Sequence, residues 1–401
     1  MKIVCVGGGP AGLYFAISIK LRNQGHDIFV LERNPVGVTY GWGVVFWDDL
    51  LDKLYNNDPG SAREIRDSSV CWNDQEVHVR GKQTAYLGGG YGFSMGRERL
   101  LSILAKGAMD LGTDVQFECE VKDLSELADA ELIVTCDGAN SWLRQLYADQ
   151  FQTNVEVGRN KYIWLGTHKV FDAFTFAFEE TDAGWIWFHA YRFNTDTSTC
   201  IVECSQETWE GLGFDELGPN ESITLLEKIF ESYLDGYSLV NQMSHLSRMP
   251  WLSFRSITNE NWYHENVVLM GDAAHTTHFT IGSGTKLAIE DAIVLAEKLD
   301  EHEELKTALK AYEEERRTAM LMFQNEAHNS SQWFENIERY INQDVMKFGY
   351  SLAKRREGET IFEGVSWHYL RRLATNKSAA LRRVRRWVYS AQRVLRARRR
   401  R

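Results

Sequence analysis

The sequence is poor in proline and lacks a long apolar segment. Its 401 residues include five prolines and no run of 18 or more consecutive apolar residues. A hydrophobic content of 44% is typical of a globular protein and excludes a disordered one. A transmembrane helix is not expected, because crossing the bilayer takes about 20 apolar residues. A glycine motif follows almost at once after the single lysine at the start, so no signal peptide is expected either.

The cysteines are few and are not arranged as metal ligands. There are six, without a CxxC pair and without a histidine at metal-ligand spacing, so no metal site is expected. Cys200 and Cys204 fall in the alternating segment TSTCIVEC, where their spacing puts both on one face of a strand. A pair of structural thiols is favoured there over a zinc site. This cysteine usage indicates a reducing compartment and predicts a cytoplasmic protein.

The charge is divided unevenly along the chain. Ten arginines and no acidic residue lie in 381–401, so the other 380 residues carry a net charge of −21 against −11 for the whole chain. An acidic body with a basic tail does not indicate nucleic-acid binding. The favoured interpretation of the tail is a solvated terminus. Contact with anionic lipid, with coenzyme A phosphates or with an acidic carrier protein stays open.

The first 35 residues predict a strand, a glycine turn, a helix and a second strand. The strands are KIVCV and DIFVLE, and the helix is expected from Pro10 to Asn23. The turn fits GxGxxG, whose glycines allow a tight turn, a close approach to a pyrophosphate and close helix packing. The acidic residue at the end of the second strand suits a ribose hydroxyl. The predicted dinucleotide contacts are Gly7, Gly9, Pro10, Ala11, Gly12, Glu32 and Arg33.

Two later glycine turns favour FAD over NAD. Asp272 follows the apolar strand VVLM in the segment GDAAH, where a carboxylate can accept from a ribityl hydroxyl. A helix expected from about Gly284 can direct its positive end at the flavin N1–C2=O edge, with Gly282 and Thr285 beside it. Asp137, in DGANS after another apolar strand, predicts a further nucleotide-facing loop. A simple turn or helix-capping role is the competing interpretation of both aspartates.

These elements predict an α/β protein in which two sheet systems are interleaved. The dinucleotide-type pieces recur on both sides of a run of alternating strands that is typical of an antiparallel sheet. We therefore expect a Rossmann-like FAD-binding domain with an inserted antiparallel β substrate domain and a helical C-terminal region. The expected boundaries are 1–155 and 258–300 for FAD binding, 156–257 for the substrate domain, 301–380 for C-terminal helices and 381–401 for the basic tail.

The motifs GGGPAG, DGANSWLR and GDAAH together resemble the class A flavoprotein aromatic hydroxylases, the family typified by para-hydroxybenzoate hydroxylase. Arg97 in GRERLLSIL matches the family's arginine near the FAD pyrophosphate. The resemblance covers roughly the first 320 residues. Within the family, YGWGVVF, NKYIWLGT, STCIVEC and HFTIGSGTK are similar to the salicylyl-CoA and 2-aminobenzoyl-CoA hydroxylases, and to the tryptophan-side-chain hydroxylase of violacein biosynthesis.

The resemblance implies an enzyme that uses FAD, with NADH or NADPH as reductant and O₂ as co-substrate. In this family a flavin C4a-hydroperoxide delivers oxygen to an activated aromatic ring. The favoured substrate is an aryl-CoA or carrier-linked thioester. A free aromatic or indole substrate, and a flavin-binding protein that no longer hydroxylates, remain as alternatives. A nucleic-acid partner is not expected, and the choice of nicotinamide and the oligomeric state stay open.

Several residues near the flavin motifs are candidates for chemistry at the ring. His275 and His278 are candidate proton relays, and Lys286 is a candidate contact to the flavin or to an anionic group. Trp42, Phe279 and His189 are candidates for lining the substrate pocket. For each of them the competing interpretation is structural: a hydrogen bond in the turn, a solvated charge or ordinary packing in the sheet.

Overall fold

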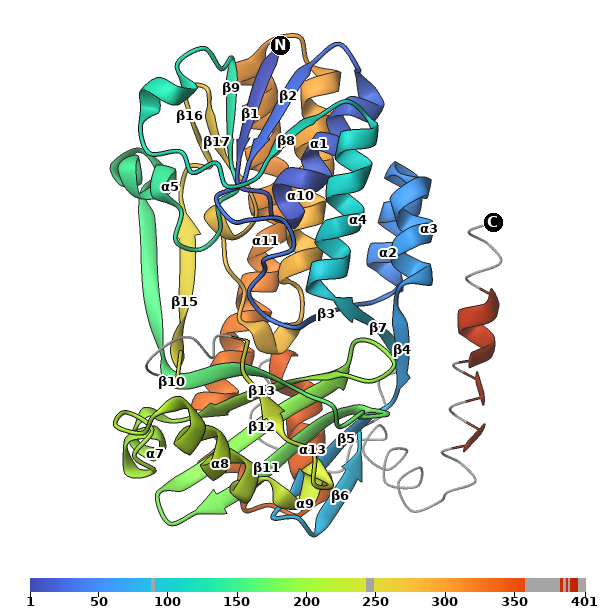
Figure 1. Ribbon diagram of the computed structural model, residues 1–401, viewed down its shortest axis with the longest axis vertical. Coiled ribbons are helices and arrows are strands. Elements are labelled where there is room, and N and C mark those ends of the chain that lie inside the picture. Colours follow the sequence, from blue (N-terminus) through green and yellow to red (C-terminus); the bar gives the residue numbers. More distant parts are fainter. Residues whose placement is uncertain (88–90, 243–248, 358–382, 385–386, 389, 396–401) are drawn as a thin grey trace.

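The computed structural model describes all residues except 88–90, 243–248, 358–382, 385–386, 389 and 396–401. It has two layers built on two large sheets, with the chain crossing between them several times (Figure 1). This is the α/β architecture with an interleaved antiparallel sheet that the sequence predicts. The prediction for the basic tail falls largely outside the described residues.

One layer is built on a sheet in the order β16-β17-β9-β1-β2-β8, in which only β16 is antiparallel to its neighbour. The strands are β1 (Lys2–Val6), β2 (Asp27–Leu31), β8 (Asp114–Gln116), β9 (Leu132–Thr135), β16 (Tyr263–His264) and β17 (Val267–Leu269). The central strands are continuous apolar runs because helices and loops bury both faces of the sheet.

The helices of this layer are α1 (Pro10–Arg22), α2 (Asp48–Asn57), α3 (Pro59–Asp67), α4 (Arg97–Asp110), α5 (Trp142–Leu146), α6 (Ala148–Phe151) and α10 (Gly284–Glu301). Helices α1, α4 and α10 lie against the sheet of this layer, and α2 and α3 pack outside them (Figure 1). Helix α1 packs against both α4 and α10, and its residues from Pro10 to Lys20 are all buried. Its apolar sequence has no polar stripe because no side of it faces water.

The second large sheet has the order β14-β10-β13-β12-β11-β5-β6, with β15 also paired to β10. Its strands are β5 (Gln75–Val79), β6 (Gln83–Tyr86), β10 (Thr153–Thr167), β11 (Phe174–Thr181), β12 (Gly184–Arg192), β13 (Ser198–Cys204), β14 (Leu239–Val240) and β15 (Leu252–Asn259). A small sheet of β3 (Gly43–Phe46), β7 (Tyr91–Gly96) and β4 (Val70–Asn73) joins the two layers.

Each face of the second sheet is covered by a separate apolar core. One core packs under α7 (Gln206–Gly211), α8 (Pro219–Ile229) and α9 (Glu231–Leu234), and it contains the free thiols of Cys200 and Cys204. The other packs under the end of α11 (Leu305–Glu335) with α12 (Glu338–Ile341) and α13 (Val345–Lys354). Short 3₁₀ turns are η1 (Leu124–Leu127), η2 (Gly271–Ala273), η3 (Phe279–Ile281) and η4 (Arg355–Glu357).

The sheet topology differs from the expected assignment of residues 1–155 to a single FAD-binding domain. Strands β5 and β6 lie within 1–155, the segment expected to bind FAD, yet β5 pairs with β11 and extends the substrate sheet. The C-terminal helices from α11 onward likewise complete a core of that sheet. Periodicity identifies a strand but carries no information about its partner, so the sequence could not assign this pairing.

Candidate functional site

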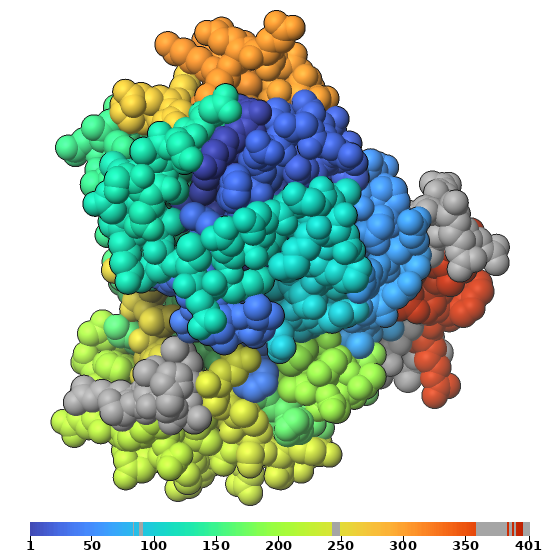
Figure 2. Space-filling view, turned by 45° about the horizontal axis from the view of Figure 1, so that its top comes forward, coloured from blue at the N-terminus to red at the C-terminus, as the bar shows by residue number. Residues whose placement is uncertain are grey.

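A cavity of about 1260 Å³ lies between the two layers and is lined from both. Figure 2 shows the face on which the N-terminal segments, in blue and teal, meet the green and yellow segments of the antiparallel layer. The neighbouring parallel strands β17, β9 and β1 end in register, with Leu269 and Val6 both opposite Thr135. The three glycine motifs follow these strand ends directly. They therefore meet at one edge of the sheet, where open α/β sheets bind ligands.

The GxGxxG turn has the close contacts that its glycines predict. Gly7 has a φ of +117°, and a Cβ atom there would lie 2.4 Å from the carbonyl oxygen of Cys136. A Cβ on Gly12 would lie 2.3 Å from the carbonyl oxygen of Gly7. Gly9 faces open space and lines the cavity together with Gly7, Pro10 and Ala11. Gly12 instead allows α1 to pack against the turn.

The acidic end of β2 is held beside this turn. One carboxylate oxygen of Glu32 accepts from the backbone N–H of Gly8 at 2.8 Å, and the other accepts from the N–H of Asn34 at 2.8 Å. Glu32 and Arg33 both line the cavity. The carboxylate is thus fixed at the sheet edge, as expected for a group that accepts from a ribose.

Arg97 and Asp272 line the cavity from different elements. Arg97 is the first residue of α4, and its Nε donates to Thr39 Oγ1 at 3.1 Å. The side chain of Asp272 is exposed to the cavity, whose desolvating walls raise the pKa of its carboxyl, and the charge of Arg97 opposes that rise. Burial lowers the pKa of Arg97, which Asp272 in turn opposes. The two opposite charges stabilise each other within the walls of the cavity.

The loop after β9 carries a buried acceptor without a partner. Asp137 lines the cavity, and its Oδ2 accepts from the backbone N–H of Trp142 at 2.9 Å, whereas its buried Oδ1 has no hydrogen-bond partner among the described residues. Burial raises the pKa of this carboxyl. Arg144 joins the loop to the turn after β17 by donating to the carbonyl oxygens of Ala139 and Ala273.

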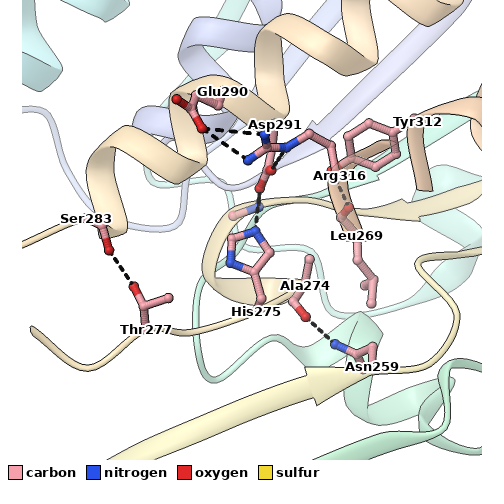
Figure 3. Close-up of polar contacts among 11 residues, drawn as sticks. Asn259, Leu269, Ala274, His275, Thr277, Ser283, Glu290, Asp291, Tyr312 and Arg316 are labelled. Atoms are coloured by element: carbon pink, nitrogen blue, oxygen red, sulfur yellow. Dashed lines mark hydrogen bonds and ion pairs between the residues drawn. The ribbon is translucent and has the colours of Figure 1, made fainter. Parts of the chain in front are cut away.

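A buried network fixes the turn that carries Asp272 (Figure 3). Asp291 on α10 accepts from the backbone N–H of Gly271 at 3.0 Å and lies 2.7 Å from Nε2 of His275. Its other oxygen accepts from Arg316 Nε at 2.6 Å. Although burial raises it, the pKa of Asp291 is held below its usual value by His275 and Arg316. The network ties α10, α11 and η2 together.

Further hydrogen bonds in Figure 3 hold the chain on either side of this turn. Tyr312 on α11 donates to the carbonyl oxygen of Leu269, and Asn259 donates to that of Ala274. The hydroxyl groups of Thr277 and Ser283 lie 3.1 Å apart, which closes the loop before α10.

The start of α10 faces the cavity through Gly282, Gly284 and Thr285. Gly282 has a φ of +64°, and a Cβ there would lie 2.9 Å from Val45. Gly284 begins the helix and has open space around its Cα. The unpaired N–H groups and the positive end of α10 are therefore presented to the cavity.

The aromatic end of the cavity is built by the antiparallel sheet together with Phe279 of η3. Phe279 and His189 line it, with ring centroids 5.6 Å apart. Burial lowers the pKa of His189 to about 3, so its imidazole is neutral, and its buried Nδ1 has no hydrogen-bond partner. Other rings of this wall are Trp164, Phe174, Phe176 and Tyr191.

Five predicted residues are not among those that line the cavity: Gly12, which packs against Gly7 as described above, and the four that follow. His275 is bound to Asp291, and His278 is buried, with its Nδ1 2.8 Å from Thr280 Oγ1. The ammonium of Lys286 lies 2.8 Å from the carboxylate of Asp49 on α2. The indole of Trp42 packs on Gly166 and Phe193 instead. The positions of His275, His278 and Trp42 favour the competing structural interpretations, whereas Lys286 is neither a lining residue nor the solvated charge that was its alternative.

Arg355 and Arg356 line the cavity, and the sequence did not single them out. They follow α13, far in sequence from every recognisable motif, in the charged segment AKRREG. Such a segment is typical of a solvated helix end, so no signal in the sequence could have found them. Only the packing of the C-terminal helices on the sheet brings them to the site.

Comparison with known proteins is consistent with this geometry. The FAD binding domain family matches residues 1–325. Salicyloyl-CoA 5-hydroxylase from a Streptomyces species is 39% identical over 85% of this chain, which spans 66% of that relative, slightly under two thirds of its length. Protodeoxyviolaceinate monooxygenase from Chromobacterium violaceum is 30% identical over 89% of this chain and 95% of its own.

A carrier-linked substrate is named for a third relative. The 3-hydroxy-4-methyl-anthranilyl-[aryl-carrier protein] 5-monooxygenase of Streptosporangium sibiricum is 34% identical over 84% of this chain and 90% of its own. Among solved structures, 2-methyl-3-hydroxypyridine-5-carboxylic acid oxygenase shares the fold, with a TM-score of 0.69 at 18% identity, over 88% of this chain and 95% of its own.

The described residues contain no helix long and apolar enough to cross a membrane. Within the same part of the chain, histidine, cysteine and acidic side chains form no group of three or more that could hold a metal ion.

Proposed function

The chain belongs to the FAD-binding domain family of flavin-dependent monooxygenases, and from this premise we propose that it hydroxylates the aromatic ring of an acyl thioester. The observation that carries the proposal is the single cavity in which the three FAD motifs and an aromatic wall face each other. Relatives named for aryl-CoA and aryl-carrier substrates support the thioester.

The donor set of the cavity fits FAD. Gly9, Gly138 and Gly284 have no atom within 4 Å of a Cβ position, so the backbone of all three motifs is open to a ligand. The partnerless oxygen of Asp137 and the carboxylate of Asp272 are acceptors for hydroxyl groups. We propose that Arg33 and Arg97 neutralise the pyrophosphate, because guanidinium groups bind phosphate oxygens in pairs.

Bound FAD, reduced by NADH or NADPH, supplies the activated oxygen from O₂ in this family. We propose that the protein contributes position, polarity and exclusion of water. The positive end of α10 stabilises negative charge at the flavin N1–C2=O edge. The rings of Phe279, Phe176 and Tyr191 hold the substrate ring and keep water away from it.

A second candidate substrate class has its own support. The chain spans 95% of the length of protodeoxyviolaceinate monooxygenase, whose name does not refer to a thioester. A free aromatic acid or indole therefore remains as the alternative substrate for the same chemistry. For compartment we propose the cytoplasm, supported by the free state of all six cysteines.

The first prediction concerns the substrate. The FAD-loaded protein is supplied with NADH or NADPH, O₂ and either salicyloyl-CoA, 2-aminobenzoyl-CoA, the two free acids, tryptophan or indole. Mass spectrometry measures the gain of one oxygen atom, and each free acid is the matched control for its thioester. We expect oxygenated product from at least one thioester and at least tenfold less from its acid.

Product from the free acids or indole alone would contradict the thioester while leaving aromatic hydroxylation in place. Oxidation of the nicotinamide that no aromatic compound accelerates, with no oxygenated product, would contradict hydroxylation of these rings altogether.

A further inference from the structure

Two arginines close the aromatic end of the cavity. Arg355 and Arg356 lie in η4, directly after α13, and both line the cavity with Ala353 of that helix. Arg355 is buried, with 6% of its surface exposed. The cavity wall beside the loop that leads into α10 therefore carries positive charge, because guanidinium groups stay protonated in proteins.

Hydrogen bonds fix the position of the Arg355 side chain without using all its donors. Its Nε donates to Ser330 Oγ at 3.0 Å, Nη1 to the carbonyl oxygen of Leu352 at 2.8 Å, and Nη2 to that of Thr280 at 2.7 Å. A guanidinium group has five N–H bonds. Within the described part of the chain no acceptor takes the other two N–H bonds of this group, whose position is set by three separate elements.

No carboxylate neutralises Arg355 at close range. Among the described residues, neither Arg355 nor Arg356 has an acidic oxygen within 4.0 Å. Burial lowers the pKa of Arg355 well below its usual value, and Glu203 is the carboxylate that opposes this. Glu203 is itself buried, and its pKa is raised to about 7. A buried cation without a close counter-ion is costly for the fold.

The surroundings of Arg355 are aromatic and contain a second unsatisfied group. Its guanidinium lies 5.7 Å from the ring centroid of Phe176. His189 contacts the same Phe176 ring, with centroids 5.9 Å apart, and its buried Nδ1 lacks a partner. A positive charge with free N–H groups and a partnerless imidazole nitrogen thus meet around one ring of the cavity wall.

We propose that Arg355, with His189 beside it, binds an anionic oxygen carried by the aromatic substrate, either an ionised ring hydroxyl or a carboxylate. This rests on the proposed function only for the statement that the occupant is an aromatic ring. An oxyanion would replace the missing counter-ion and accept the free N–H bonds, giving a charge-assisted hydrogen bond. Neutral rings such as anilines and indoles lack this contact.

The second prediction uses ring compounds that differ in one substituent. Binding of 4-nitrophenolate, 4-nitrobenzoate and 4-nitroaniline to the FAD-loaded, oxidised protein is measured by calorimetry, at a pH at which the phenol is ionised and without nicotinamide. We expect at least one anion to bind tenfold or more tightly than the neutral aniline. Which anion does so distinguishes the hydroxyl from the carboxylate source.

Variants separate the charge from the hydrogen bonds to the protein. Arg355→Met removes both, whereas Arg355→Lys keeps the charge but cannot form all three hydrogen bonds to Ser330, Leu352 and Thr280. We expect the preference for the anion to be lost in R355M and kept in R355K. Arg99→Met is the matched control, because Arg99 is an exposed arginine paired with Glu64. It should leave the preference unchanged.

Equal binding of aniline and both anions by the unaltered protein would overturn the inference, even if R355M does not fold. So would a preference that survives in R355M. Turnover is not read in this experiment, so a protein that prefers anions but oxygenates no ring would contradict the proposed function alone.

Discussion

Two buried histidines beside the aromatic end of the cavity are held neutral by the fold. Burial lowers the pKa of both His189 and His278 to about 3, and the charge of Arg355 adds to the effect. In the unfolded chain a histidine titrates near 6.5. Neither imidazole is therefore expected to act as a charged proton donor near neutral pH.

The third prediction follows from these two residues. Between pH 6.5 and about 3 the unfolded chain binds protons at both positions and the folded protein does not. The free energy of unfolding should therefore fall as the pH is lowered through this window, by about 1.4 kcal/mol per pH unit for each histidine. Urea unfolding at a series of pH values measures the slope.

The variants His189→Gln and His278→Gln separate the contribution of each histidine to this pH dependence from the contributions of other groups. Glu203, with its pKa raised to about 7, acts in the opposite direction above pH 4.5 and is present in every protein compared. In each variant the slope of the free energy of unfolding against pH should be smaller by about 1.4 kcal/mol per pH unit, the contribution of one histidine. Slopes unchanged in both variants would mean that these histidines are protonated in the folded state.

At the scale of elements, helix α10 holds the turn that carries Asp272 in place. Asp291 lies on the helix that starts at the cavity, and its carboxylate reaches Gly271, His275 and Arg316 at once. Removing one partner of a buried ion pair leaves an uncompensated charge, which costs about 3–5 kcal/mol. Arg316 would then retain only Glu290, at 3.5 Å.

The fourth prediction is that Asp291→Asn lowers the free energy of unfolding by about 3 kcal/mol and weakens FAD binding. The loss of FAD affinity is expected because the turn of Asp272 loses its anchor at Gly271. Urea unfolding and fluorescence titration with FAD measure the two effects. Glu297→Gln is the control, since Glu297 is on the same helix but pairs with Arg22 at the surface, where a pair contributes about 1 kcal/mol or less. Equal effects of the two variants would refute the anchoring role.

At the scale of the whole molecule, the two layers cannot be separated by one cut in the chain. The core of the parallel layer contains residues from Ile3 to Met320, including α10 packed on α1. In the other layer, the core under the C-terminal helices contains Val77 and Val79 from the N-terminal part of the chain and Phe348 from the C-terminal part. Each layer is thus assembled from distant segments.

The fifth prediction is that residues 1–155 alone neither fold cooperatively nor bind FAD. This fragment lacks β17, α10 and Asp272, and it leaves β5 without its partner strand β11 and without the C-terminal helices that cover its apolar face. Circular dichroism during urea unfolding and FAD titration measure the outcome, with the whole chain as control. A fragment with a sharp unfolding transition and bound FAD would show instead that the N-terminal layer is autonomous.

The sequence by itself determined that the three glycine motifs line one cavity at the edge of the parallel sheet. Gly7, Asp137 and Asp272 follow buried strands, and adjacent parallel strands end at a common edge. These local signals suffice because a tight turn, or a neighbouring backbone segment that comes close, restricts which residue type can stand at that position.

Only the tertiary structure decided the rest of the site. Lys286 lies in the motif GSGTK, but its position on α10 directs its side chain to Asp49 on α2. Arg355 has no motif at all, and it reaches the aromatic wall because α13 packs on the face of the antiparallel sheet that also carries Phe176. Pairing and packing between distant segments depend on complementary surfaces, which leave no pattern in the local sequence of either segment.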